Sequence, residues 1–320
     1  MSLTWSISQD QIFHSCERRY FFQYILHARV NSRDPLLREI AFLKKLKAIP
    51  AWKGTVFHSL VSEYFRNIVN NRNIDLADLL EMCKRRINKQ WEFSKRNLGR
   101  TNIKLINNGI GVALIEHEHG ENLPEDILEQ VIGDIEGWVR KFKVWENNVG
   151  LCKELQKASE TWIEPNIFGK EAPGLDIDGI RVITKVDLAF HTNEGEFNIY
   201  DWKTGKRYTG QASLLNQADF QAGVYQLWPH TKLGKNLDSV KTHFVYLGEE
   251  NAPEHRTFTI DENFREHIIS LIRKSILRMQ HIQGLYNKAK LNLGDLDFAR
   301  YEKACIYCPF KRICQKELEK

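Results

Sequence analysis

The sequence from Phe197 to Lys206 reads FNIYDWKTGK and places an acid and an amine two residues apart. The first half of this stretch is apolar and β-prone, which predicts a strand. Because alternate residues of a strand point to the same face, Asp201 and Lys203 should project together from one side of a sheet, near the point where Gly205 ends the strand. An acid that can hold a metal, beside an amine that can steer a water, suits hydrolysis. A surface ion pair on an edge strand is the alternative.

A second β-prone run precedes this stretch. Residues 181 to 190 read RVITKVDLAF, and the turn signal Asn193-Glu194-Gly195 separates them from the first run. The two runs are therefore expected to form a hairpin. Asp187 lies among apolar residues in this earlier strand, and an unpaired buried carboxylate is costly, so a cation or donors should lie nearby. Two carboxylates and one lysine are thus expected to converge.

The pattern formed by Asp187 and the run Asp201-Trp202-Lys203-Thr204-Gly205 resembles the motif of PD-(D/E)XK nucleases. It is similar to the RecB-like form of that motif, which ends Asp-Tyr-Lys-Thr-Gly. That form is commonly followed by a helix with Gln-x-x-x-Tyr, matched by Gln221 and Tyr225 in a helix expected over residues 211 to 228. It is commonly preceded by a helix with a histidine after Gly-Thr, which His58 matches.

One departure from the family pattern is Thr184, because many relatives have a glycine three residues before the first acid. The resemblance implies an α/β fold with a restriction-endonuclease-like core, in which helices flank a mixed central sheet. We expect residues 1–70 and 156–320 to form this core. Residues 71–155, which are mainly helical in pattern, are expected to form an inserted helical subdomain.

The resemblance also implies a division of roles in the site. The implied ligands of one or two Mg²⁺ or Mn²⁺ ions are His58, Asp187, Asp201 and the carbonyl group of Trp202. Lys203 is expected to position the attacking water or to stabilise charge in the transition state, while Gln221 and Tyr225 orient Lys203 or contact the substrate strand. Lys206 and Arg207 are candidates for binding flanking phosphates. Glu160 and Glu164 flank another predicted strand, and one of them is a further candidate acid.

Three of the six cysteines crowd into Cys305-x2-Cys308-x5-Cys314. In a chain without a secretory signal, such clustering favours metal binding over disulfides. A four-thiolate site needs a fourth ligand, for which Cys16 is the natural candidate, although a cysteine at that position alone would be a small buried hydrophobe. Zinc and iron–sulfur clusters both accept four thiolates, so these residues alone leave the two open.

The order of these cysteines around a RecB-like core resembles that of iron–sulfur nucleases, which include the AddB nuclease domain and the CRISPR-associated iron–sulfur exonucleases. That resemblance implies a [4Fe–4S] cluster held by Cys16, Cys305, Cys308 and Cys314. Such a cluster would join the two ends of the domain across a very long loop. The stability of the fold should then depend on the cluster.

Composition restricts the remaining possibilities. The chain has 320 residues, 42% of them hydrophobic and 27% charged, and its net charge of +5 permits a polyanionic partner without requiring one. No run is long enough for a membrane span and no signal peptide is visible, so we expect a cytoplasmic protein with no membrane partner. No Walker A loop is present, so a helicase motor would have to act in trans.

The activity expected from all this is metal-dependent DNA hydrolysis, as a single-strand-specific exonuclease in DNA repair, recombination or CRISPR adaptation. The partners expected are DNA with free ends and a helicase or CRISPR-adaptation protein. The alternative is a non-catalytic nucleic-acid-binding protein that keeps the nuclease fold, with a structural iron–sulfur or zinc site. A zinc-bound transport or scaffold protein is a third option.

Overall fold

The computed structural model describes residues 3–164, 173–207, 217–299 and 303–318. These residues form two compact units, each described here by itself. The first unit contains residues 1–7, 54–84 and 129–274, and the second contains residues 8–53, 85–128 and 275–320. The helical segment expected as one subdomain over residues 71–155 contributes to both units.

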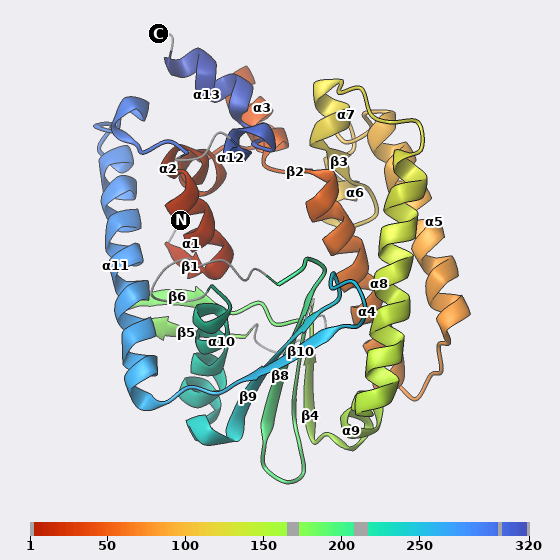
Figure 1. Ribbon diagram of the computed structural model, residues 1–320. Helices are drawn as coiled ribbons and strands as arrows, with labels where there is room; N and C mark the ends of the chain where they lie inside the picture. Colours follow the sequence, from red (N-terminus) through yellow and green to blue (C-terminus); the bar gives the residue numbers. More distant parts are fainter. Residues whose placement is uncertain (1–2, 165–172, 208–216, 300–302, 319–320) are drawn as a thin grey trace. The chain divides into compact units, whose positions relative to one another are not determined.

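The first unit is built on a mixed five-stranded sheet with the strand order β10-β9-β8-β7-β4 (Figure 1). Its strands are β4 (Glu160–Ile163), β7 (Leu188–His191), β8 (Phe197–Lys203), β9 (Val240–Tyr246) and β10 (Glu254–Phe258). Strands β8 and β9 run parallel, and the other neighbouring pairs are antiparallel. Together with its helices this sheet confirms the predicted α/β class.

The hairpin predicted around Asn193-Glu194-Gly195 is present as β7 and β8, and Gly195 takes the left-handed conformation with φ 95°. The single strand predicted over residues 181 to 190 was wrong. It is divided into β6 (Ile180–Ile183) and β7, which belong to different sheets: β6 pairs with β1 (Thr4–Ser6) and β5 (Gly174–Ile177). A chain that changes sheets has to leave the extended ladder, and Asp187 lies in this break.

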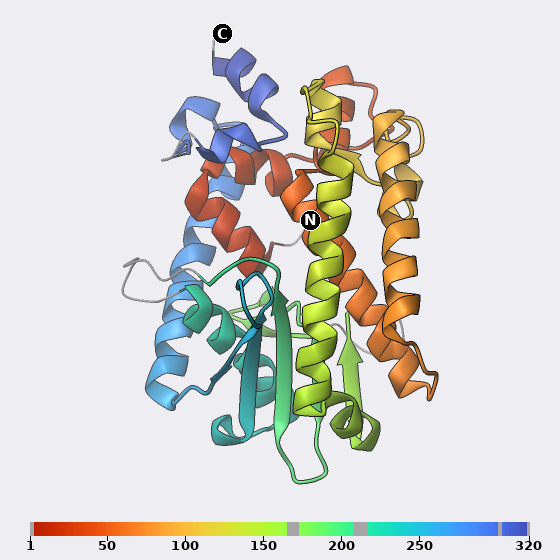
Figure 2. The same ribbon diagram turned by 45° about the vertical axis from the view of Figure 1, so that its right-hand side comes forward.

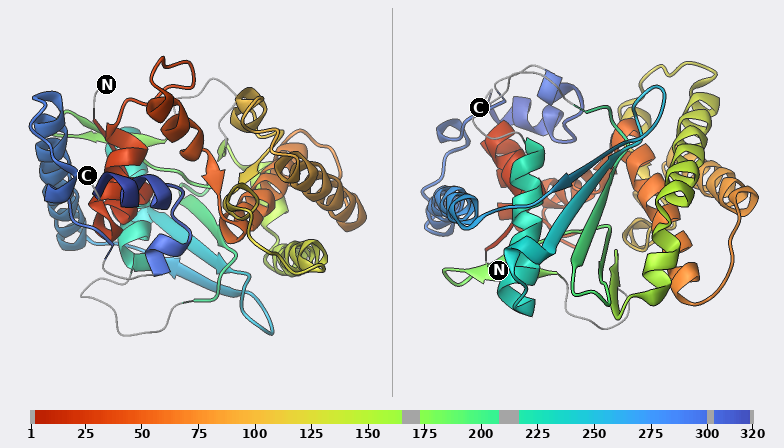
Figure 3. Two further views of the ribbon diagram at one scale, coloured as in Figure 1. Left: turned by 90° about the horizontal axis from the view of Figure 1, so that it is seen from above. Right: turned by 60° about the horizontal axis from the view of Figure 1, so that its bottom comes forward.

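Successive side chains of β8 point to opposite faces of the sheet, so the Trp202 ring and the Asp201 carboxylate lie on different faces. The ring of Trp202 stacks on Phe65 with centroids 5.8 Å apart and meets Phe142 edge-on at 5.3 Å. Phe65 belongs to α4 (Ile49–Val69) and Phe142 to α8 (Ile127–Val149), so these helices cover one face of the sheet (Figure 2). Asp201 points to the other face, where its carboxylate contacts Gln221 and Tyr225 of α10 (Gln217–Leu233). Figure 3 shows α10 and the sheet from two further directions.

Helix α10 is held closely by α11 (Glu262–Asn287). A Cβ atom added to Gly223 would lie 2.0 Å from the Cδ1 atom of Ile268, so a larger residue here would require the Ile268 side chain to move. Gly223 stands midway between Gln221 and Tyr225 in the sequence, so α10 is packed against α11 at the segment that carries both side chains. The predicted start of this helix, residues 211–216, falls outside the described residues.

The second unit is mainly helical. Its short elements are α1 (Ile7–Ser15), α2 (Glu17–Tyr20), η1 (Phe21–Ile25), α3 (Pro35–Leu43), β2 (Leu46–Lys47), α6 (Ile103–Asn107), β3 (Ala113–Leu114), α7 (Ile115–His119), η3 (Leu293–Asp295), α12 (Lys303–Ile306) and α13 (Lys311–Leu318). The remaining elements of the chain are α5 (Leu76–Lys95), α9 (Leu151–Lys157) and η2 (Leu237–Ser239). None of the described helices is long and apolar enough to cross a membrane.

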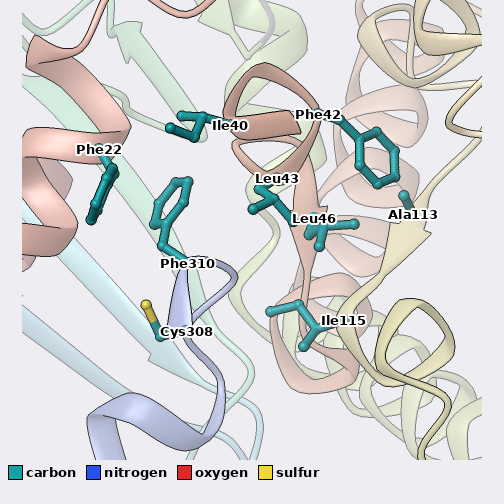
Figure 4. Close-up of a cluster of buried hydrophobic side chains, with 9 residues drawn as sticks. All are labelled: Phe22, Ile40, Phe42, Leu43, Leu46, Ala113, Ile115, Cys308 and Phe310. Carbon is teal, nitrogen blue, oxygen red and sulfur yellow. The ribbon is translucent and has the colours of Figure 1, made fainter. Parts of the chain in front are cut away.

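A buried cluster in the second unit joins distant parts of the sequence (Figure 4). Phe22 stacks on Phe310 with ring centroids 5.4 Å apart, and Cys308 lies beside them in the same cluster. Truncation of one such buried phenylalanine typically costs about 3–5 kcal/mol, so this contact is a substantial tie between residues near the two ends of the chain.

Candidate active site

The acid and the amine of β8 meet two side chains of α10 on one face of the sheet. The Nζ atom of Lys203 lies 2.8 Å from Oδ1 of Asp201 and donates to Oε1 of Gln221, also at 2.8 Å. The other carboxylate oxygen of Asp201 accepts from the hydroxyl of Tyr225 at 2.8 Å and from Nε2 of Gln221 at 3.0 Å. Gln221 and Tyr225 are themselves hydrogen-bonded at 2.6 Å, which closes a ring of four side chains.

A second acid pairs with the histidine of α4 next to this ring. Oδ1 of Asp187 lies 2.8 Å from Nδ1 of His58, and Oδ2 accepts the backbone N–H of Trp202 at 2.9 Å. The Asp187 carboxylate is therefore anchored to β8 between Asp201 and Lys203. The structure thus brings together His58, Asp187, Asp201, Lys203, Gln221 and Tyr225. It places the backbone of Trp202 among them and the Trp202 ring on the opposite face.

Burial controls the electrostatics of the ring. It raises the pKa of the Asp201 carboxyl, and the nearby Asp187 carboxylate raises it further, whereas the charge of Lys203 acts in the opposite direction. Burial and the adjacent Asp201 also keep the pKa of Tyr225 well above its usual value, so this hydroxyl remains a donor. Burial alone would lower the pKa of His58, but contact with Asp187 raises it.

Two residues that the sequence pointed to weakly or not at all also belong to the site. Glu164 follows β4, and its backbone N–H donates to the carbonyl oxygen of Asp187 at 3.1 Å. Burial raises the pKa of the Glu164 carboxyl, and the nearby Asp187 carboxylate raises it further. Glu160 begins β4, at the opposite end of the strand. The second residue is Phe244, whose ring centroid lies 4.7 Å from the Nζ atom of Lys203. Phe244 is the partner of Asp201 in the register of β8 and β9, which places its ring beside the site.

The described residues contain no group of three or more His, Cys, Asp and Glu that gathers its ligand atoms around one point. At this site the reason lies in the hydrogen bonds, because all four carboxylate oxygens of Asp187 and Asp201 have partners within the protein. The donor set, two carboxylates and an imidazole, nevertheless suits Mg²⁺ or Mn²⁺. Lys203 places its own positive charge beside Oδ1 of Asp201, the oxygen at which a cation would add to it.

The four cysteines of the proposed cluster lie in the second unit. Burial raises the pKa of the Cys308 thiol to about 11, and the thiols of Cys16 and Cys305 add to this shift. The same two neighbours raise the pKa of Cys314, after burial as the main cause. Cys16, from the start of the second unit, and Cys305 therefore lie near both Cys308 and Cys314. In the part of the chain that is described, the four thiols are not drawn into the geometry of a metal site.

Comparison with known proteins assigns the family. Residues 4–315 match the PD-(D/E)XK nuclease superfamily, and the chain belongs to it. Members of this superfamily hydrolyse phosphodiester bonds and typically use Mg²⁺ or Mn²⁺. No curated protein sequence matches the chain. Among solved structures, the one described as "Crystal structure of SSO0001" is similar with a TM-score of 0.31 and 14% identity, covering 83% of this chain and 98% of that one.

Proposed function

We propose that this chain is a Mg²⁺- or Mn²⁺-dependent deoxyribonuclease that degrades single-stranded DNA from its ends. The observation that carries the proposal is the closed ring of Asp201, Lys203, Gln221 and Tyr225 with Asp187 and His58 beside it. A protein that kept the fold only for binding would not require an amine, two acids and an imidazole in mutual contact.

The roles follow from these contacts. His58, Asp187, Asp201 and the carbonyl of Trp202 would hold the cation, and Glu164 is the acid best placed to add to them. When bound, the cation would lower the pKa of a water and offset charge on the phosphate. Gln221 accepts a hydrogen bond from Lys203 and would thereby aim the amine toward the water or a phosphate oxygen. Tyr225 holds Asp201 from the other side.

We further propose a [4Fe–4S] cluster bound by Cys16, Cys305, Cys308 and Cys314. Its support is that thiols far apart in the sequence lie in one unit, where Cys16 and Cys305 are near enough to raise the pKa of Cys308 and of Cys314. Anaerobically purified protein should then be brown, absorb near the ~400 nm region typical of thiolate-bound iron, and contain iron rather than zinc. DNA repair, recombination and CRISPR adaptation are the pathways in which such an activity would serve.

A digestion assay tests the nuclease proposal. End-labelled single-stranded DNA with free or blocked ends is incubated with wild-type protein in Mg²⁺, Mn²⁺ or EDTA, next to Asp187→Asn. Cleavage that needs the metal, the aspartate and a free end is the expected result. Metal-dependent cleavage of the blocked strand would replace the exonuclease with an endonuclease. DNA binding without cleavage under all metal conditions would favour the non-catalytic alternative.

A further inference from the structure

The segment that follows the catalytic strand presents three hydrogen-bond donors, and all three are bound to acids. Nζ of Lys206 lies 2.5 Å from the carboxylate of Glu250. The backbone N–H of Arg207 donates to Glu249 at 2.7 Å, and the guanidinium of the same arginine donates to Glu254 at 2.7 Å. We call the turn between β9 and β10, with the first residue of β10, the acidic hairpin (residues 247–254).

The backbone holds the acidic hairpin against this segment. A Cβ atom on Gly248 would lie 2.4 Å from the backbone carbon of Gly205, so the two main chains approach as closely as glycine permits. The N–H of Leu247 donates to the carbonyl of Lys203 at 2.7 Å, and the side chain of Lys141 donates to the carbonyl of Glu249. The carboxylates therefore reach their donors from a fixed base rather than from a free loop.

An ammonium, a backbone N–H and a guanidinium are the groups with which proteins bind the phosphates of nucleic acids. The donors here begin three residues after Lys203. One further donor supports the same interpretation. Nε of Arg207 is buried and has no hydrogen-bond partner in the described part of the chain. Carboxylates occupy the positions that a phosphate would take.

We propose that Lys206 and Arg207 bind the phosphates of a single-stranded nucleic acid next to the catalytic centre, and that Glu249, Glu250 and Glu254 compete for these donors in the free protein. This inference rests on the proposed function, because it takes that substrate as its ligand. The competition is weak enough to be reversed: the side chains of Lys206 and Glu250 are 60% and 78% exposed, and exposed ion pairs are easily exchanged.

Two consequences can be measured. Removal of a competing carboxylate should tighten single-strand binding by about two- to fivefold for each pair, the factor expected for exposed ion pairs. It should also steepen the salt dependence of binding, by about 0.7 in the slope of log K against log salt for each cation freed to neutralise a phosphate. Replacement of Lys206 or Arg207 should change both quantities in the opposite direction.

The test is fluorescence anisotropy of a labelled single-stranded DNA oligonucleotide in EDTA, with wild-type protein, Glu250→Gln, Glu254→Gln and the double variant. Glu262→Gln is the matched control, because Glu262 pairs with Arg265 on α11 and its loss changes the net charge equally. Tighter binding and a steeper slope for the hairpin variants alone are expected. Equal effects in the hairpin variants and in Glu262→Gln, or no measurable binding by the double variant at low salt, would overturn the inference.

The same proteins are then assayed for cleavage in Mg²⁺ and Mn²⁺. Tighter binding by the hairpin variants together with no cleavage by any protein would retain the phosphate site and defeat the nuclease proposal. Normal metal-dependent cleavage with no change in binding would retain the nuclease proposal and defeat the phosphate site. The two proposals can therefore fail separately.

Discussion

The chain carries two sets of residues that can bind metals, one of carboxylates with a histidine and one of thiols, and they differ in how many partners they have within the protein. In the first unit, each carboxylate oxygen of Asp187 and Asp201 already has a protein partner. In the second unit, Cys16 and Cys305 lie near enough to Cys308 and Cys314 to raise the pKa of both, but the described residues show no shared ligand geometry.

This difference has a physical origin. A carboxylate that is buried without a partner is costly, so a site built from acids has to be completed by donors such as Lys203 and Tyr225 before any cation arrives. A thiol is nearly apolar when protonated, and burial raises the pKa of Cys308 to about 11, so it remains a thiol at neutral pH. Thiols therefore need no partner until a metal deprotonates them. The oxygen site is arranged by folding, whereas the sulfur site would be arranged by its metal.

The largest effect should come from Lys203→Ala. If the amine acts on the water or on the phosphate, its loss should lower the rate of DNA cleavage by about 10²–10⁴-fold, the range for a positioned acid–base group. Binding of single-stranded DNA in EDTA should change little, because Lys206 and Arg207 remain. Single-turnover cleavage in Mg²⁺, together with anisotropy, separates the two quantities.

Lys232→Ala serves as the control, because this lysine of α10 pairs with Asp176 on the surface and lies outside the ring. It should cleave at the wild-type rate. If Lys203→Ala cleaves as fast as Lys232→Ala, the amine has no catalytic role and the completed oxygen site is only a structural ion pair.

The next largest effect should come from Cys16→Ser. Cys16 is the N-cap of α2 and accepts the N–H of Arg19 at 3.4 Å, and serine is at least as good a cap as cysteine. A loss of stability that is accompanied by a loss of bound iron therefore reports the sulfur as a metal ligand rather than as a cap. We expect a loss on the order of 3 kcal/mol, the scale of a cross-link that closes a long loop, measured by urea denaturation of anaerobically purified protein.

Cys152→Ser is the matched control in the first unit. The Cys152 thiol lies 3.1 Å from the Tyr64 hydroxyl, a hydrogen bond that serine can keep, and burial raises its pKa to about 12. This variant should lose about 1 kcal/mol or less. Equal midpoints for Cys16→Ser and wild-type protein, with no iron in either, would remove the cluster and leave four ordinary thiols.

The sequence could predict that Asp201 and Lys203 lie together because their spacing is local, whereas His58, Gln221 and Tyr225 were expected there only through the resemblance to the family. The two-residue spacing of Asp201 and Lys203 on a strand, and the four-residue spacing of Gln221 and Tyr225 on a helix, fix relative directions without further information. The division of residues 181 to 190 between two sheets could not be predicted, because β6 finds its partners in β1 and β5, far away in the sequence. Periodicity does not record which sheet a strand joins.

The ion-pair partners of Lys206 and Arg207 could not be predicted from the sequence either. Lys206 and Arg207 follow the catalytic strand directly, but the acids that bind them come from a hairpin more than forty residues later. Glu164 gave a weak signal for the same reason, because its proximity to Asp187 depends on the pairing of β4 with β7. Local spacing therefore predicted which groups of one element lie together, and tertiary pairing determined which acids contact them.

The smallest effect, and the sharpest test of how the oxygen site is completed, should come from Tyr225→Phe. This change removes the hydroxyl that donates to Asp201 at 2.8 Å and leaves Gln221 as the remaining donor to the same oxygen. Loss of one hydrogen bond to a buried charged group costs about 1.5–3 kcal/mol, so we expect lower stability by urea denaturation. Cleavage in Mg²⁺ should fall less than in Lys203→Ala, because Lys203 and both acids are still present.

The metal concentration at half-maximal cleavage distinguishes a positioning role from a merely structural one. If Tyr225 holds Asp201 in place for the cation, Tyr225→Phe should need more Mg²⁺ than wild-type protein, and added Mg²⁺ should restore much of the rate. If Tyr225 only packs, stability falls while the Mg²⁺ requirement stays the same. That second outcome would mean that the protein donors do not preorganise the carboxylate, and the contrast with the thiols of the second unit would lose its basis.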